Sequence, residues 1–123
     1  MQDVTANDNF ANNGEGGFLF ARFSTPILVQ NSSIGGSHSG QGGGAMAVYA
    51  SSIGLDGTAI ENSLSKGGAG GGALLLDGSA EAQVTGGSFF NKNTASGGGT
   101  GGHVRLSASK LVVHGESSRL EWP

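Results

Sequence analysis

Short apolar segments with a two-residue alternation recur along the chain at a nearly constant spacing. One series follows pairs of glycines and occupies residues 18–20, 46–48, 74–76 and 104–106. The last glycines before these segments, Gly17, Gly44, Gly72 and Gly102, are separated by 27, 28 and 30 residues. A second series, at residues 27–29, 53–55, 82–84 and 111–113, keeps the same period. The chain is therefore a repeat of about 28 residues, and the repeat is the first feature that a fold must explain.

A third apolar position follows five or six residues after the second series. It is occupied by Phe10 after Val4, and then by Ile34, Ile60 and either Phe89 or Phe90. Alternation at period two predicts strands, and segments this short, separated by Gly, Asn, Ser and Asp, are not typical of helices. Three strands per repeat predict one coil of a triangular solenoid, in which each strand pairs with its copy in the next coil.

We therefore predict an all-β fold, a right-handed single-stranded parallel β-helix of four to five coils. Residues 1–123 form a single β-helix domain in this interpretation, a fragment of a longer solenoid. Disorder is the alternative that composition leaves open, because the 25 glycines among 123 residues are many and the share of large aliphatic residues and Phe is only slightly above that of disordered chains.

The stacking predicts which side chains share a column. The inward columns are Met46, Leu74 and Val104; Val48, Leu76 and Leu106; Ile27, Ile53, Ala82 and Leu111; and Val29, Leu55, Val84 and Val113. The outward columns are Ala45, Ala73 and His103, and Ala47, Leu75 and Arg105. An outward Leu75 could mark a contact face.

Corners of a β-helix need residues that tolerate positive φ, as Gly and Asn do. The corner positions expected after the second series are Asn31, Gly57, Gly86 and Gly115, and those after the third series are Asn12, Asn62 and Lys92. Stacked Asn amides can hydrogen-bond along the axis as a ladder.

Composition and charge narrow the function classes. The net charge of −3 and six scattered Lys and Arg residues argue against nucleic-acid binding. No apolar run approaches the length of a membrane span, about 18 residues, so we expect no membrane-spanning segment. The absence of Cys excludes disulfides. Residues 1–8 do not resemble a signal peptide, so if the chain is exported its signal is expected upstream.

Two short motifs resemble the repeats of the polymorphic outer membrane protein family, whose autotransporter-type passengers carry many copies of G-G-A-[ILV] and F-x-x-N. The first motif is approximated by Gly43-Gly44-Ala45-Met46 and matched by Gly71-Gly72-Ala73-Leu74; the second is matched by Phe10-Ala11-Asn12-Asn13 and Phe90-Asn91-Lys92-Asn93. The two Phe motifs also share a frame, in which Val4 superposes on Val84. The resemblance implies a right-handed β-helix displayed outside a cell with adhesive or structural roles.

The resemblance covers nearly the whole chain, with departures. Phe18 and His103 replace the Ala of the first motif, and Ile34 and Ile60 replace the Phe of the second. The expected translocator barrel is also missing, which predicts a fragment or a distant relative.

Catalytic chemistry has weak support in the sequence. Glycoside cleavage needs two carboxylates about 5 to 9.5 Å apart, yet no column holds two acids. Asp56 is expected to stack with Gln30, Thr85 and His114, and Asp77 with Tyr49 and Ser107. We predict no catalytic, cofactor-binding or metal-binding residues and no cofactor, since His38, His103 and His114 are dispersed and the Gly runs lack the Asp of calcium-binding repeats. Asp56, Asp77 and Arg105 are the candidates if the chain is an enzyme.

The sequence thus favours a non-catalytic, surface-displayed or secreted β-helix module, extracellular or at the cell surface, with a structural or adhesive role. The alternative is a fragment of a carbohydrate-active β-helix enzyme, a polysaccharide lyase or glycoside hydrolase. Expected partners are a host-cell or glycan surface, and open terminal coils could also associate end to end.

Overall fold

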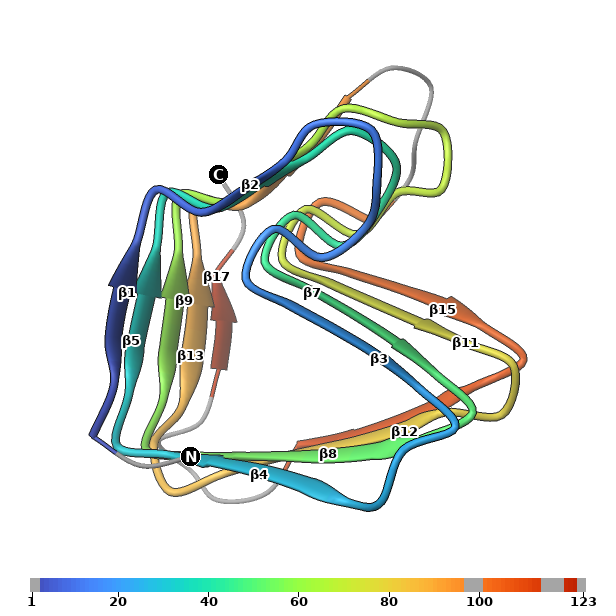
Figure 1. Cartoon of the computed structure of the whole chain (residues 1–123). Coiled ribbons are helices and arrows are strands. Elements are labelled where there is room, and N and C mark those ends of the chain that lie inside the picture. The colour runs from blue at the N-terminus through green and yellow to red at the C-terminus, as the bar shows by residue number, and fades with distance from the viewer. Residues whose placement is uncertain (1–2, 97–100, 114–118, 122–123) are drawn as a thin grey trace.

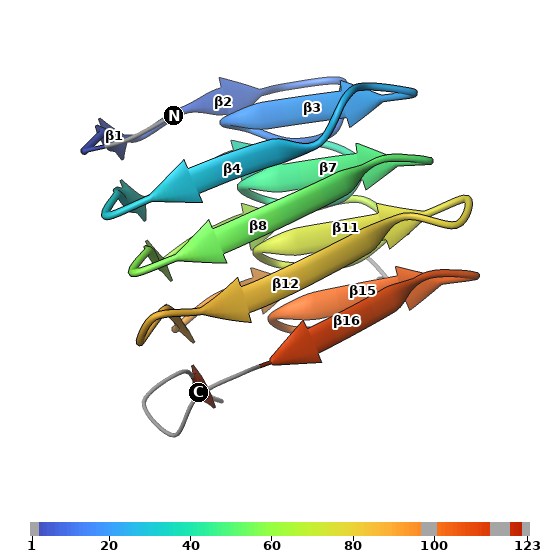
Figure 2. The same ribbon diagram turned by 90° about the horizontal axis from the view of Figure 1, so that it is seen from below.

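Four parallel β-sheets form the walls of a solenoid in the computed structural model, which describes residues 3–96, 101–113 and 119–121 (Figure 1). The described residues contain strands and no helix. The chain runs clockwise around the axis in Figure 1, and the same strands seen from below show each coil stacked beyond the one before (Figure 2). The fold is a right-handed parallel β-helix of about four coils, as predicted.

The first two walls follow each other in every coil. We call them the β1 sheet and the β2 sheet. The β1 sheet contains β1 (Thr5–Asn7), β5 (Ser33–Gly35), β9 (Ala59–Glu61), β13 (Phe89–Asn91) and β17 (Arg119–Glu121). The β2 sheet contains β2 (Phe10–Ala11), β6 (His38–Ser39), β10 (Leu64–Ser65) and β14 (Thr94–Ala95).

The other two walls, the β3 sheet and the β4 sheet, have longer strands. The β3 sheet contains β3 (Leu19–Arg22), β7 (Met46–Tyr49), β11 (Leu74–Asp77) and β15 (Val104–Ser107). The β4 sheet contains β4 (Ile27–Gln30), β8 (Ser52–Asp56), β12 (Glu81–Thr85) and β16 (Lys110–Val113). A coil therefore has four strands, not the three predicted. The sequence did not reveal the β2 sheet because its strands have two residues each and show no alternation.

The inward columns of the β3 and β4 sheets are confirmed. Leu74 pairs with Met46 on one side and with Val104 on the other, and both Met46 and Leu74 are fully buried. Leu106 and Val113 stand in the predicted columns but are 44% and 41% exposed. They lie on β15 and β16, the last strands of their sheets, so a neighbouring strand packs against each of them from one side only.

The prediction that the column of Ala45, Ala73 and His103 faces outward is wrong. All three are fully buried, and so are Ala47 and, to 3% exposure, Leu75. The segment that connects the β2 and β3 sheets covers this face: a Cβ on Gly42 would lie 2.9 Å from Cδ2 of Leu75. Leu75 is therefore an interior contact between the wall and the connecting segment, and the proposed contact face at Leu75 does not exist.

The first coil is also out of phase with the predicted frame. Ile34, Ile60 and Phe90 stack as expected, but their partner in the first coil is Ala6. Phe10 lies instead on β2, where it pairs with His38. The Phe10 motif and the Phe90 motif therefore occupy different walls, and their superposition on the shared frame is wrong.

Corner residues show the same shift. Asn31, Gly57 and Gly86 have φ between 49° and 63°, and Asn62 and Lys92 have φ of 54° and 53°, as predicted for both corners. The first coil uses Asp8, with a φ of 55°, where Asn12 was expected. Gly115 lies outside the described residues.

Axial hydrogen bonds at the corners come from hydroxyl side chains as well as from Asn: the amide of Asn93 accepts the Ser63 N–H over 2.9 Å and donates to the Ile60 carbonyl over 3.0 Å in the preceding coil. Between the β4 and β1 sheets, the Ser32 N–H donates to Oγ1 of Thr58 over 3.4 Å, and the Thr58 N–H donates to Oγ of Ser88 over 2.8 Å. A second corner repeats the arrangement, with the Ser24 N–H donating to Oγ of Ser51 over 2.9 Å. Buried backbone donors at the corners are thus satisfied by the coil below.

Candidate functional site

The outer face of the β3 sheet brings polar and aromatic side chains from successive coils into one row. Arg22 pairs in register with Tyr49, Tyr49 with Asp77, and Asp77 with Ser107. Their positions alternate with the buried Ala21, Val48 and Leu76, so their side chains point away from the core. The row combines a guanidinium, a phenol, a carboxylate and a hydroxyl.

Glu15 joins this row from the segment that precedes β3. Its carboxylate accepts a hydrogen bond from the phenol of Tyr49. Burial raises the pKa of Tyr49 well above its ordinary value of 10.0; the hydrogen bond and the negative charges of Glu15 and Asp77 raise this pKa further, while Arg22 acts in the opposite direction. The phenol is therefore neutral and a hydrogen-bond donor at physiological pH.

Phe20 supplies an aromatic surface beside Tyr49. The two ring centroids lie 5.7 Å apart and the planes are inclined by 46°. Phe20 is 51% exposed. Glu15, Phe20, Arg22 and Tyr49 line a hollow of about 250 Å³, somewhat below the about 300 to 1,000 Å³ of pockets that enclose drug-sized ligands. A ligand here would be held against one side of the solenoid.

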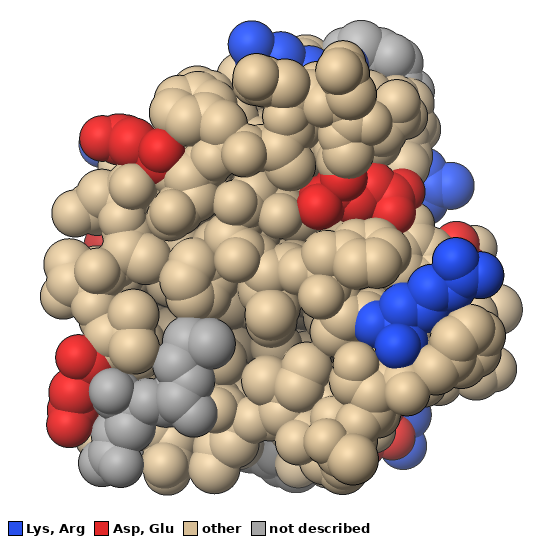
Figure 3. Space-filling model, viewed as in Figure 1, with Lys and Arg blue, Asp and Glu red and all other residues tan. Residues whose placement is uncertain are grey.

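Phe23 extends the aromatic surface beyond the hollow. It is 75% exposed at the corner after β3, and the guanidinium carbon of Arg22 lies 5.3 Å from its ring centroid. This contact restrains Arg22 at the rim of the hollow. Figure 3, which views the solenoid along its axis, shows that charged side chains on the end formed by the first coil are few and scattered among uncharged ones.

The acids and the arginine considered for catalysis lie in different columns. Asp56 lies on the β4 sheet between Gln30 and Thr85, as predicted; its expected neighbour His114 lies outside the described residues. Asp77 lies on the β3 sheet, and its Oδ1 accepts the Gly78 N–H over 2.7 Å. Arg105 shares that sheet but pairs with Leu75 in a different column.

Sequence reasoning singled out none of Phe20, Arg22 and Glu15 as a site residue, and Glu15 carried the least signal. It belongs to a connecting segment outside the aligned columns, and it meets a tyrosine one coil away. The sequence carries no periodic signal for such a contact. The prediction that Asp77 stacks with Tyr49 and Ser107 is confirmed, but column analysis could not reveal a second acid beside Tyr49.

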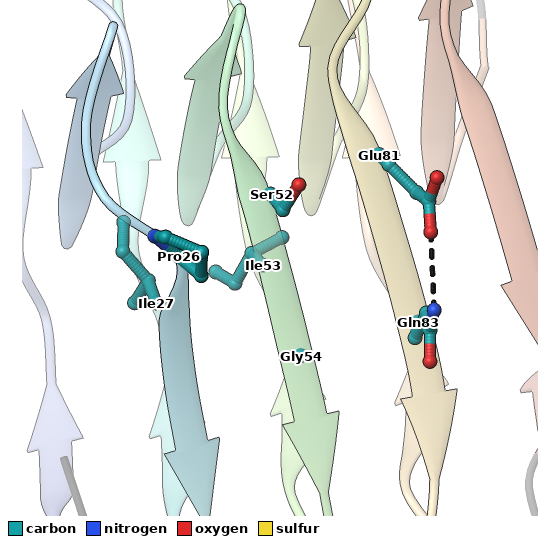
Figure 4. Close-up of a pocket in the computed structure, with 7 residues that line it drawn as sticks. All are labelled: Pro26, Ile27, Ser52, Ile53, Gly54, Glu81 and Gln83. Atoms are coloured by element: carbon teal, nitrogen blue, oxygen red, sulfur yellow. Dashed lines mark hydrogen bonds between the residues drawn. The ribbon is translucent and has the colours of Figure 1, made fainter.

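A second hollow lies on the β4 sheet (Figure 4). It opens over Gly54, which has no side chain between Leu28 on one strand and Gln83 on the other. The Gln83 amide donates to a Glu81 carboxylate oxygen over 3.0 Å at its edge. Its lining is Pro26, Ile27, Ser52, Ile53, Gly54, Glu81 and Gln83. With about 120 Å³ and no aromatic surface, it offers a ligand less than the β3 sheet does.

The histidines are separated in the described part of the chain. His38 lies on β6, where its ring meets Phe10 edge-on at 4.9 Å between centroids. His103 is buried, and its Nδ1 lies 3.3 Å from Nδ2 of Asn93. His114 lies outside the described residues. Residues 3–96, 101–113 and 119–121 contain no group of three His, Asp or Glu side chains arranged for a metal ion.

Comparison of this chain with family models, with curated proteins and with solved structures gives no match. Among the described residues, no helix has the length and apolarity to cross a membrane. The parallel β-helix therefore rests on the strand pairing itself, and the resemblance to polymorphic outer membrane proteins stays a prediction.

Proposed function

We propose that the chain is a non-catalytic β-helix module of the polymorphic outer membrane protein type, displayed outside the cell, with a structural and adhesive role. The observation that carries this proposal is the exposed aromatic surface that Phe20, on β3, and Phe23, at the corner after β3, present in the first coil. Phe20 and Phe23 are 51% and 75% exposed. Exposed aromatic rings are costly for solubility and are enriched where proteins bind partners.

Adhesion to a host-cell or glycan surface is tested by retention of the intact chain. Fixed cells, immobilised glycoproteins and immobilised polysaccharides are incubated with increasing protein concentration. We expect saturable retention on at least one of these surfaces and none on a bare support. Equal retention on every surface, the bare support included, would show nonspecific adsorption and contradict the proposal.

A carbohydrate-active enzyme fragment is the second candidate, because the charges of Glu15 and Asp77 both raise the pKa of Tyr49. Two acids beside a neutral phenol could serve acid–base chemistry on a glycan. Incubation with polyuronides and neutral glycans separates the two proposals. New reducing ends or unsaturated products that disappear in Asp77→Asn would favour the enzyme; intact polymers would favour the adhesive module.

A further inference from the structure

We propose that the hollow lined by Glu15, Phe20, Arg22 and Tyr49 binds one neutral sugar ring of a polysaccharide. This inference rests on the proposed adhesive function and assigns a ligand class to a particular site.

The charges favour an uncharged ligand. Arg22 is a donor of hydrogen bonds only, whereas the carboxylate of Glu15 accepts only, and Asp77 adds a second carboxylate in the adjoining coil. An anion would gain from Arg22 but face both carboxylates, and a cation would gain from the carboxylates but face Arg22. Adjacent hydroxyls of a sugar can accept from the guanidinium and donate to a carboxylate together.

The aromatic surface supplies the other half of the recognition. Phe20 is half exposed, and Tyr49 is inclined against it at 5.7 Å, which holds the Phe20 ring at a defined angle. The C–H face of a pyranose can pack on such a ring while its hydroxyls point to the rim. Restraint of Tyr49 by Glu15 and of Arg22 by Phe23 reduces the side-chain entropy lost on binding.

The size of the hollow limits what it can hold. Its volume of about 250 Å³ admits one ring and leaves the rest of a chain in solvent. A single stacked ring with a few hydrogen bonds corresponds to weak binding, with a dissociation constant on the order of 1 mM. Several copies on one surface would bind a polymer more tightly through avidity.

The test is a nuclear magnetic resonance titration of the intact chain with methyl glycosides of neutral hexoses. Tyr49 is the only tyrosine, so its ring signals report on the site without ambiguity. We expect saturable shifts of the Tyr49 ring with at least one glycoside. Phe20→Ala should weaken binding about fivefold or more, and Arg22→Gln about tenfold, from the loss of ring stacking and of charge-assisted donors respectively.

Phe10→Ala is the matched control. Phe10 lies in the same coil and is exposed to a similar degree, but it packs on His38 on the β2 sheet. Its removal should leave the dissociation constant unchanged. Since Phe20 and Arg22 both point to solvent, circular dichroism spectra of all three variants should match that of the unchanged chain.

Three outcomes overturn the inference. The Tyr49 signals could stay fixed with every glycoside, they could shift more with a uronic acid or a quaternary ammonium compound than with any neutral sugar, or Phe10→Ala could weaken binding as much as Phe20→Ala. If the chain still adheres to cells or polysaccharides in these cases, the adhesive function stands and the site is wrong. If the glycoside binds but the chain adheres to no surface, the site stands and the adhesive function fails.

Discussion

Two consecutive glycines lead into each strand of the β3 sheet, and each is required for a different reason. Gly43 has a φ of 59°, and a Cβ there would clash with the carbonyl oxygen of Met46. Gly44 does not have a positive φ, but a Cβ there would clash with the carbonyl oxygen of Gly72 in the next coil. The first glycine makes the turn, and the second lets two coils approach.

Gly44→Ala should therefore destabilise the protein by about 3 kcal/mol or more, because the obstacle is backbone that cannot move aside. The urea midpoint of unfolding measures this loss. Gly68→Ala is the control, because a Cβ there meets nothing within 4 Å. Its free energy of unfolding should change by no more than about 0.5 kcal/mol. Equal midpoints for both variants would contradict the steric role of Gly44.

Tyr49 makes stability depend on pH at the alkaline end. Its pKa in the folded chain is raised above the value of 10.0 that it has when unfolded, so folding favours the protonated phenol. This contribution is fully present below pH 10 and is lost as pH rises through the higher folded pKa. We expect the urea midpoint to fall above about pH 10 more steeply in the unchanged protein than in Tyr49→Phe.

Ultraviolet absorbance offers a direct check, since ionisation of the only tyrosine can be followed as the pH is raised. Tyrosinate should form at higher pH in the folded chain than in urea. Ionisation at the same pH in both states would show that burial and Glu15 do not act on the phenol.

At the scale of the element, the corners are held by hydroxyls as well as by backbone conformation. Thr58 is fully buried; its Oγ1 lies 3.1 Å from the carbonyl oxygen of Val29 and accepts the N–H of Ser32. Thr58→Val keeps the shape but leaves that N–H and the carbonyl without this partner. We expect a loss of about 1 to 3 kcal/mol in the free energy of unfolding, measured by urea denaturation.

The exposed Thr25 provides the comparison for this substitution. Thr25→Val should leave stability within about 0.5 kcal/mol of the unchanged protein. If Thr58→Val proved as harmless as Thr25→Val, the ladder of hydroxyls would contribute nothing to the corner.

Alternation along the sequence was sufficient to predict three walls and their inward columns, because large residues such as Met46 and Leu74 recur at one register. The β2 sheet escaped prediction because a strand of two residues cannot show a period. The phase of the first coil was misplaced because Phe10 imitates Phe90, while the true partner, Ala6, is small. Burial of Leu75 and the approach of Glu15 depend on connecting segments, whose course no repeat encodes.

For the whole molecule, stacking predicts that a coil can be removed without disturbing its neighbours. Deletion of residues 46–73 joins Ala45 to Leu74 and restores a Gly-Gly-Ala-Leu entry, because Leu74 stands directly over Met46. The shortened chain should keep a β-type circular dichroism spectrum. Its stability should fall by roughly 1 to 4 kcal/mol, at about 0.05 to 0.15 kcal/mol per residue removed.

Deletion of residues 46–59, half of that length, is the matched control. It joins Ala45, which leads into the β3 sheet, directly to Ile60, which belongs to the β1 sheet. The inward columns can then no longer align. We expect loss of the cooperative urea transition. A half deletion that unfolds as cooperatively as the full one would contradict the stacked arrangement.

The coils share one frame of strands and corners, so backbone pairing alone does not distinguish one coil from the next during folding. A segment that skipped one coil and docked on the next would regain most of its backbone pairing. Two features distinguish the fourth coil: the bulk of Phe90, whose column holds Ala6, Ile34, Ile60 and Leu120 in the other coils, and the buried contact between Asn93 and His103. Because these side chains fit the interior of the fourth coil, we expect them to disfavour arrangements in which a coil is paired with the wrong neighbour.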